Sequence, residues 1–222
     1  MTQNPETKVP ATAVELMTEL VGADLHDLCD AAESAIEDGG GFGWLKAPER
    51  HVMESYWRGV LLVPERELFV ARLDGVIAGS AQLQRSPRNN EAQAYVGQLT
   101  TFFLAPWSRG HGLARRLVEA VEARAVEHGL KAITLDVRDT QTRAIQLYEA
   151  MGYRRWGTNP YYALVDGHWV GGHYYVKPLE EWQAPAPGGG PAANADDSPG
   201  SHPGGAPGSG LGGGYPGGGG LS

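Results

Sequence analysis

Cysteine is nearly absent from this sequence, since Cys29 is the only one in 222 residues. A single thiol forms no intramolecular disulfide and builds no multi-cysteine site, so we expect no disulfide and no bound metal. Basic runs are also missing, and the formal net charge of -8 argues against a nucleic-acid partner. No stretch reaches the apolar length of a membrane span, and the N-terminal residues lack the basic and then apolar pattern of a secretory signal. We therefore expect a cytoplasmic protein with no nucleic-acid or membrane partner.

Glycine and proline are abundant, but they concentrate at one end of the chain. From about Gln183 onward they dominate the sequence, and large apolar side chains are nearly absent. Such a segment cannot bury enough surface to offset the entropy of ordering its backbone. We expect a flexible N-terminus at residues 1–9, one folded domain at 10–182 and a disordered Gly/Pro-rich tail at 183–222. A solvated extension is the simplest interpretation of the tail, and a partner-binding role stays open.

Hydrophobic periodicity predicts a mixed α/β order of elements. The predicted elements are a strand at 13–20, helices at 23–38 and 47–62, three strands within 67–105, a helix at 113–128, a strand at 131–138, a helix at 141–151 and two strands within 153–179. The dipeptides Asp74-Gly75 and Asp166-Gly167 are typical of two-residue hairpin turns. The long strand that starts at Glu91, the helix after it and the next strand form a βαβ crossover, which predicts a mixed sheet.

The stretch Ser108 to Ala114, SRGHGLA, joins the long strand to the predicted helix at 113–128. Backbone N–H groups at a helix N-terminus lack intrahelical partners and lie at the positive end of the helix dipole, so they can bind a phosphate. Gly110 and Gly112 allow close approach of the backbone, and Arg109 can add a charged contact. The same residues are also consistent with a glycine-containing helix start alone. Neither the GxxxxGK[ST] loop nor the dinucleotide-binding glycine pattern is present.

Two motifs resemble those of one known family. LAPWSRGHGLARRLVEAVE resembles the acetyl-CoA-binding motif of the GNAT superfamily of N-acetyltransferases, R/Q-x-x-G-x-G/A, at Arg109, Gly112 and Ala114. LDVRDTQTRAIQLYEAMGYRRWG resembles the later A-x-x-L-Y-x-x-x-G-F/Y motif of that superfamily, which includes Tyr148 and Gly152. The resemblance implies the GNAT fold of the α/β class, with a mixed central sheet of about seven strands and about four helices. It covers nearly all of the predicted domain.

The resemblance also implies an activity and its residues. It implies transfer of an acetyl group from acetyl-CoA to a primary amine, with direct attack in a ternary complex and Tyr148 as general acid. The substrate is then a small-molecule amine, and a homodimer is possible in such a fold. The residues implied to contact CoA are Phe102, Phe103, Leu104, Arg109, Gly110, His111, Gly112, Leu113, Ala114 and Gln141. A non-catalytic acyl-CoA-binding sensor or scaffold of the same fold is the alternative.

The general base is not identified by these motifs. An alkylammonium group has a pKa of about 10.4, so a group or water chain must accept its proton. Many relatives carry a glutamate on the long strand, where this chain has Gln98, and glutamine cannot act as a base. Glu91 is one substitute, and a water chain near Tyr95 or His173 is another.

The acceptor end of the cleft is implied by a looser resemblance to the tabtoxin-resistance acetyltransferase branch. This resemblance rests on the glycine-rich link after the first predicted helix, together with the second helix, and on the final pair of strands. In the GNAT fold, the link between the first two helices and the final hairpin flank the acceptor end of the cleft. The residues predicted to line the substrate site are Phe42, Trp44, Tyr161, Tyr162 and Tyr174, although each aromatic side chain is also consistent with ordinary packing.

Overall fold

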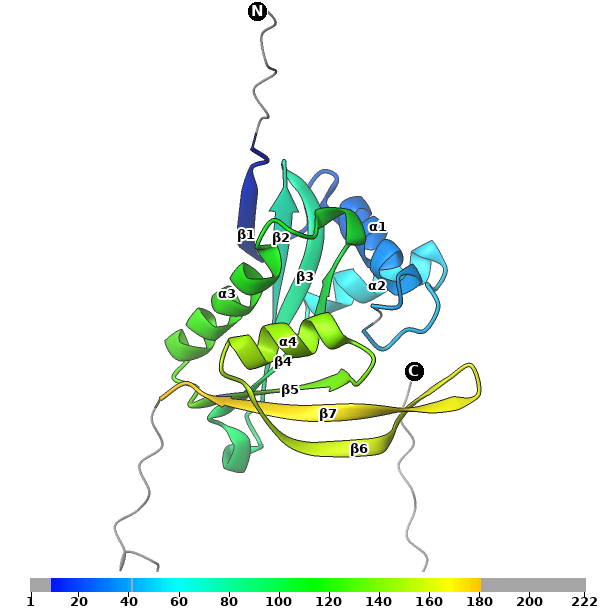
Figure 1. The fold of residues 1–222 in the computed structure, drawn as a ribbon. Coiled ribbons are helices and arrows are strands. Elements are labelled where there is room, and N and C mark those ends of the chain that lie inside the picture. The colour runs from blue at the N-terminus through cyan, green and yellow to red at the C-terminus, as the bar shows by residue number, and fades with distance from the viewer. Residues whose placement is uncertain (1–8, 41, 181–222) are drawn as a thin grey trace, which may run out of the picture. The chain divides into compact units, whose positions relative to one another are not determined.

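The sheet has seven strands in the order β1-β2-β3-β4-β5-β7-β6 (Figure 1). The computed structural model describes residues 9–40 and 42–180. The elements are β1 (Thr12–Met17), α1 (Asp24–Glu37), α2 (Arg50–Val60), β2 (Arg66–Leu73), β3 (Val76–Arg85), β4 (Val96–Leu104), α3 (Leu113–Glu127), β5 (Ala132–Arg138), α4 (Thr142–Ala150), β6 (Arg154–Val165) and β7 (His168–Pro178). The predicted seven-stranded mixed sheet with four helices is confirmed. The predicted tail at 183–222 lies outside the described residues.

Both predicted hairpin turns are confirmed by their backbone angles. Asp74 and Gly75 have φ of 49° and 87° between β2 and β3, and Asp166 and Gly167 have φ of 47° and 80° between β6 and β7. Two successive residues with positive φ match the twist of antiparallel strands. Within the described ranges, no helix is long and apolar enough to cross a membrane.

Three predicted boundaries are wrong. The long strand begins at Val96 and not at Glu91, because Glu91–Gln93 form a 3₁₀ turn. The sequence there, EAQA, lacks the β-branched and aromatic residues that favour strands. β1 ends at Met17, where its pairing with β2 ends, and α2 begins at Arg50, because Glu49 has an extended ψ of 145°.

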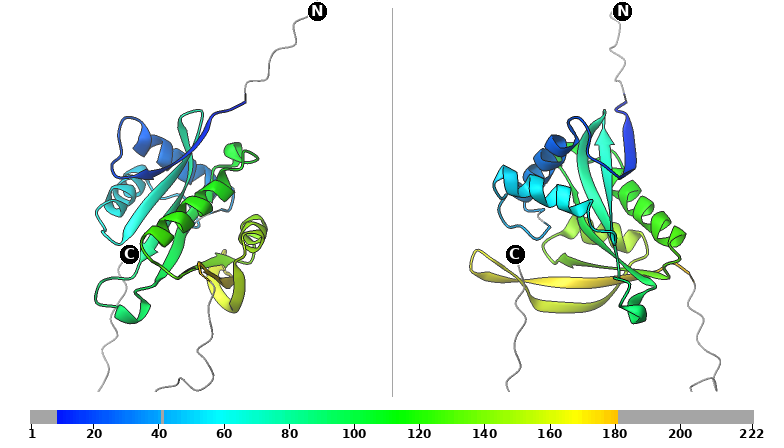
Figure 2. Two further views of the ribbon diagram at one scale, coloured as in Figure 1. Left: turned by 90° about the vertical axis from the view of Figure 1, so that its left-hand side faces the viewer. Right: turned by 180° about the vertical axis from the view of Figure 1, so that it is seen from behind.

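Helices cover both faces of the sheet (Figure 2). Alternate side chains of β2 point to opposite faces, as the pleat requires. Leu68 and Val70 pack in the core under α1 and α2. Phe69 and Ala71 pack in the second core, which α3 and α4 cover. The sheet is therefore the middle of three layers.

The parallel strands β4 and β5 separate soon after they begin. They pair only from Val96 with Ala132 to Gln98 with Thr134. β4 then continues to Leu104, while β5 runs with β7 and β6 in another direction (Figure 1). Thr101 of β4 has a φ of 49°, and the pairing of β4 with β3 shifts register there. The edge of β4 beyond Gln98 is therefore left without a β5 partner.

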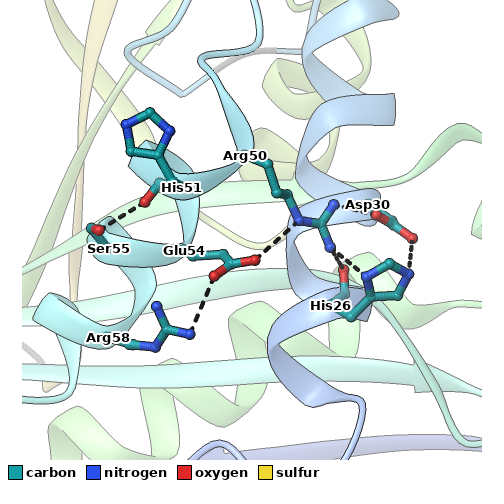
Figure 3. A network of polar contacts seen from close by, with 7 residues as sticks. All are labelled: His26, Asp30, Arg50, His51, Glu54, Ser55 and Arg58. Atoms are coloured by element: carbon teal, nitrogen blue, oxygen red, sulfur yellow. Dashed lines mark hydrogen bonds and ion pairs between the residues drawn. The ribbon is translucent and has the colours of Figure 1, made fainter.

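A network of charged side chains joins α2 to α1 (Figure 3). Arg50 is hydrogen-bonded to the carboxylate of Asp30 and donates to the backbone oxygen of His26 at 2.8 Å. Glu54, one turn along α2, is 3.6 Å from Arg50 Nε and 3.2 Å from Arg58. These contacts are largely exposed, so each contributes little to stability. Together they join the start of α2 to the first half of α1.

Candidate active site

The glycine turn connects β4 to α3. Gly110 and Gly112 have φ of 88° and 72°, the left-handed region that glycine adopts at low cost. Gly112 is the N-cap of α3, and no described side chain caps this helix. Ser108 is buried, and its hydroxyl donates to the carbonyl oxygen of Ala105 at 2.9 Å, which holds the turn. The first amides of α3 are therefore available to an anion.

A cavity of about 1050 Å³ adjoins this turn, and we call it the turn cavity. Of the residues predicted to contact CoA, all but His111 line it: Phe102, Phe103, Leu104, Arg109, Gly110, Gly112, Leu113, Ala114 and Gln141. Asp38 at the end of α1 and the partly exposed Arg115 line it as well. The turn cavity therefore brings together the glycine turn and the free edge of β4.

A second cavity of about 540 Å³ lies between β4 and β5, and we call it the inner cavity. Both cavities are lined by Gly40, Phe102, Gln141 and Ala144, so they adjoin each other. The inner cavity is the more aromatic of the two. Among its walls are Phe42, Trp44, Tyr148 and Tyr162, all of which the sequence placed at the site.

Two of the aromatic residues predicted for the substrate site lie elsewhere. Tyr161 is 66% exposed, and its ring packs edge-on against Trp169 on the outer hairpin. Tyr174 packs between Trp156 and Tyr162, with ring centroids 5.5 Å and 6.3 Å away. Neither lines either cavity. Tyr161 is next to Tyr162 on β6, so its side chain faces the opposite side of the strand. Tyr174 is the register partner of Asp136 and packs edge-on against the ring of Tyr162.

Tyr148 on α4 lies at the wall of the inner cavity. It is 4% exposed, and its ring is 5.7 Å from those of Phe102 and Tyr153. Its hydroxyl makes no hydrogen bond to any described residue. Burial raises the pKa of this phenol well above its usual value, and the negative charge of Asp136 raises it further. Tyr148 therefore keeps its proton at neutral pH.

Asp136 is a residue of the inner cavity that the sequence reasoning missed. Its Oδ1 accepts a hydrogen bond from Gln98 Nε2 at 3.1 Å, and its Oδ2 accepts one from the hydroxyl of Tyr162. Burial and the bond to Asp136 both raise the pKa of Tyr162, which keeps its proton for this bond. The alternation of apolar and polar residues in strand 131–138 could have indicated it, because Asp136 lies on the face opposite to buried Leu135 and Val137.

The residues that the sequence offered as substitutes for a glutamate base lie outside both cavities. Glu91 is exposed in its 3₁₀ turn, and Tyr95 is 64% exposed. His173 is hydrogen-bonded to Thr158 at 3.1 Å and lines neither the turn cavity nor the inner cavity. The geometry therefore gives Asp136 a better position than these three.

The link between α1 and α2 contacts the far side of the cleft. Asp38 forms an ion pair with Arg109 of the glycine turn at 2.6 Å. The carbonyl oxygen of Gly39 accepts from Gln141 Nε2 at 2.6 Å and from Arg138 at 3.3 Å. Arg109 and Gln141, both predicted to contact CoA, thus also hold the link that carries Phe42 and Trp44. No group of three His, Cys, Asp or Glu side chains in the described ranges is placed to hold a metal ion.

Comparison with known proteins gives one consistent family. A model described as the acetyltransferase (GNAT) family matches residues 27–153. An uncharacterized N-acetyltransferase of the hisH-hisA intergenic region of Azospirillum brasilense is 62% identical over 130 residues, which are 59% of this chain and 77% of that protein.

Solved structures show the same fold. A phosphinothricin acetyltransferase from Sinorhizobium meliloti in complex with acetyl-CoA has a TM-score of 0.63 at 20% identity, over 81% of this chain and 94% of that one. An N-acetyltransferase from Staphylococcus aureus Mu50 has a TM-score of 0.66 at 16% identity, over 77% of this chain and 99% of that one.

Proposed function

Because the chain belongs to the acetyltransferase (GNAT) family and is an acetyl-CoA-dependent N-acetyltransferase, we propose that its acceptor is the primary amine of a small molecule. In this proposal the amine attacks the acetyl group directly while both substrates are bound. One observation carries the proposal, namely the adjoining turn and inner cavities with four lining residues in common. A donor in one cavity and an acceptor in the other would meet at Tyr148.

The turn cavity is the proposed site of acetyl-CoA. The uncapped amides of α3 and the guanidinium of Arg109 suit the pyrophosphate, because both supply positive charge at a helix N-terminus. The unpaired edge of β4 from Phe102 to Leu104 suits an extended arm with amide groups, since its backbone has no β5 partner. His111 makes no contact with the cavity, so we expect it to contribute its backbone amide at most.

Bound acetyl-CoA would supply the thioester, and Tyr148 would supply the proton. A departing thiolate needs a proton, and the phenol of Tyr148 lies in the wall of the inner cavity with its proton in place. Positioned proton transfer of this kind typically contributes on the order of 100- to 10,000-fold in rate. A sensor that binds acyl-CoA without turnover would need the packed ring at this place but not its hydroxyl.

The inner cavity is the proposed site of the acceptor. Its volume of about 540 Å³ lies within the range of about 300–1,000 Å³ that small-molecule sites occupy. The rings of Phe42, Trp44 and Tyr162 form apolar walls that also suit a cationic amine. We keep the looser resemblance to the tabtoxin-resistance branch as a proposal about this end of the cleft.

Titration calorimetry and thiol release together test the proposed function. Acetyl-CoA should bind to the protein, and a panel of small primary amines should include members that release free thiol together with an N-acetylated product. Free peptides with a primary amine provide the matched comparison, and we expect slower release from them. Tight binding of acetyl-CoA with no thiol release from any amine would favour the sensor. Absence of acetyl-CoA binding would reject both.

Two further parts of the proposal concern the whole chain. We propose a cytoplasmic protein, and a homodimer that uses the edge strand β6, which exposes Trp156 and Tyr161. Light scattering of the purified protein reports its mass directly. A monomeric mass at concentrations of tens of micromolar or more would reject the dimer.

A further inference from the structure

The inner cavity holds one carboxylate among its described lining residues, and it belongs to Asp136. We infer that Asp136 is the general base of the reaction, and that Gln98 and Tyr162 position its carboxylate. This inference rests on the proposed function, because it assigns the acceptor's proton to a residue of the same cleft. The proposed base then lies on β5, two residues beyond the residue that pairs with Gln98 of β4.

The hydrogen bonds around Asp136 suit a base. Gln98 donates through Nε2 at 3.1 Å and Tyr162 donates through its hydroxyl, so both carboxylate oxygens act as acceptors. Two donors on different oxygens fix the plane and direction of the carboxylate. Each oxygen keeps a second lone pair, which can accept from an ammonium group. Gln98 thus positions the carboxylate of Asp136, at a place on the strand where many relatives carry the glutamate that acts as the base.

The charged and titratable groups around Asp136 come from four elements. Tyr162 of β6 bonds to it, Tyr148 of α4 shares its cavity, Tyr174 of β7 is its register partner, and Arg138 lies two residues along β5 on the same face. The phenols of Tyr148 and Tyr162 keep their protons, because their pKa values are raised. Asp136 therefore supplies the one carboxylate among the described residues that line this cavity.

Asp136 and Tyr148 together account for every proton that moves in the reaction. The ammonium group of the acceptor gives one proton to Asp136, which passes it to solvent. The freed lone pair forms the C–N bond as the C–S bond breaks and its electron pair moves to sulfur. Tyr148 protonates the sulfur, and the second proton lost by nitrogen returns to Tyr148. The products are an amide and free CoA thiol, with one proton released to water.

Asp136→Asn tests the assignment with 2-phenylethylamine and butylamine as probes, and Asp139→Asn is the matched control. Asp139 is an exposed carboxylate next to the end of β5 and lines neither cavity. We expect Asp136→Asn to lower kcat/KM at pH 7 on the order of 100- to 10,000-fold. The deficit should shrink as the pH rises toward the amine pKa of about 10.4, where solution already supplies the free amine. The affinity for acetyl-CoA should stay within about twofold.

Tyr162→Phe tests the positioning role and covers the case in which Asp136→Asn fails to fold. Without the Tyr162 hydroxyl the carboxylate holds its proton more tightly, so the acid limb of the pH–rate profile should move to higher pH. A rate of Asp136→Asn close to that of the parent would overturn the assignment. So would a deficit that is the same at every pH, or an acid limb that Tyr162→Phe leaves in place. A parent protein that acetylates neither probe nor any other amine rejects the proposed function itself.

Discussion

Replacement of Tyr148 by phenylalanine separates the catalytic role of this residue from its packing role. The side chain is 4% exposed, and its ring contacts Phe102 and Tyr153, which phenylalanine preserves. The hydroxyl has no hydrogen-bond partner among the described residues. Tyr148 lines the inner cavity, and removal of its hydroxyl breaks no hydrogen bond to a described residue, so we expect Tyr148→Phe to be about as stable as the parent. The transferable proton is lost, and kcat should fall on the order of 100- to 10,000-fold.

The assay is thiol release from acetyl-CoA with saturating amine, combined with thermal melting of each variant. Tyr153→Phe is the matched control, because this buried phenol lies 5.7 Å from the Tyr148 ring and lines neither cavity. We expect it to retain the parental kcat. A Tyr148→Phe rate within about threefold of the parent would refute the general-acid role. A large drop in its melting temperature would refute the account of its unpaired hydroxyl.

Three other perturbations have expected outcomes. Asp38→Asn frees Arg109 from its 2.6 Å ion pair and removes a negative charge from the turn cavity. Calorimetry should then show that acetyl-CoA binds about two- to tenfold more tightly at low salt, with a smaller gain at high salt. Weaker binding would contradict the proposed phosphate site. Gly112→Ala places a Cβ at a φ of 72°, which costs about 1–2 kcal/mol and should lower the melting temperature by about 2–8 °C; an unchanged value would contradict the strained turn. Burial raises the pKa of Tyr148 and Tyr153 in the folded state. The contribution of the two neutral phenols to the free energy of unfolding is therefore complete below the unfolded-state pKa of about 10, and it is lost as the pH rises above that pKa. Denaturant titrations should show this loss, and the loss should be smaller in Tyr148→Phe.

Local signals predicted most of the fold. Asp74-Gly75 and Asp166-Gly167 specify their turns because both positions need positive φ, and the structure has it at all four residues. The start of the long strand was placed too early because its prediction relied on residues after Tyr95. The first four residues from Glu91 have weak strand preference, and they form a 3₁₀ turn instead.

The contacts that complete the site depend on residues far apart in sequence. Asp136 meets Gln98 across 38 positions, and Arg109 meets Asp38 across 71. The periodicity of strand 131–138 places Asp136 on the face opposite to the apolar side chains, but only the register of β4 with β5 puts Gln98 beside it. The sequence likewise did not distinguish Tyr162, which lines the inner cavity, from its exposed neighbour Tyr161, because the two faces of β6 cannot be told apart without its partner strand.

The position of the CoA sulfur in a crystal of the CoA complex tests the central claim most directly, which is that the two cavities form one donor and acceptor cleft. We expect the pyrophosphate on the amides from Gly110 to Ala114 and the sulfur within about 4 Å of the Tyr148 hydroxyl. The inner cavity would then remain open to an amine on the Asp136 side. A sulfur far from Tyr148, or a pyrophosphate bound away from the glycine turn, would contradict the account.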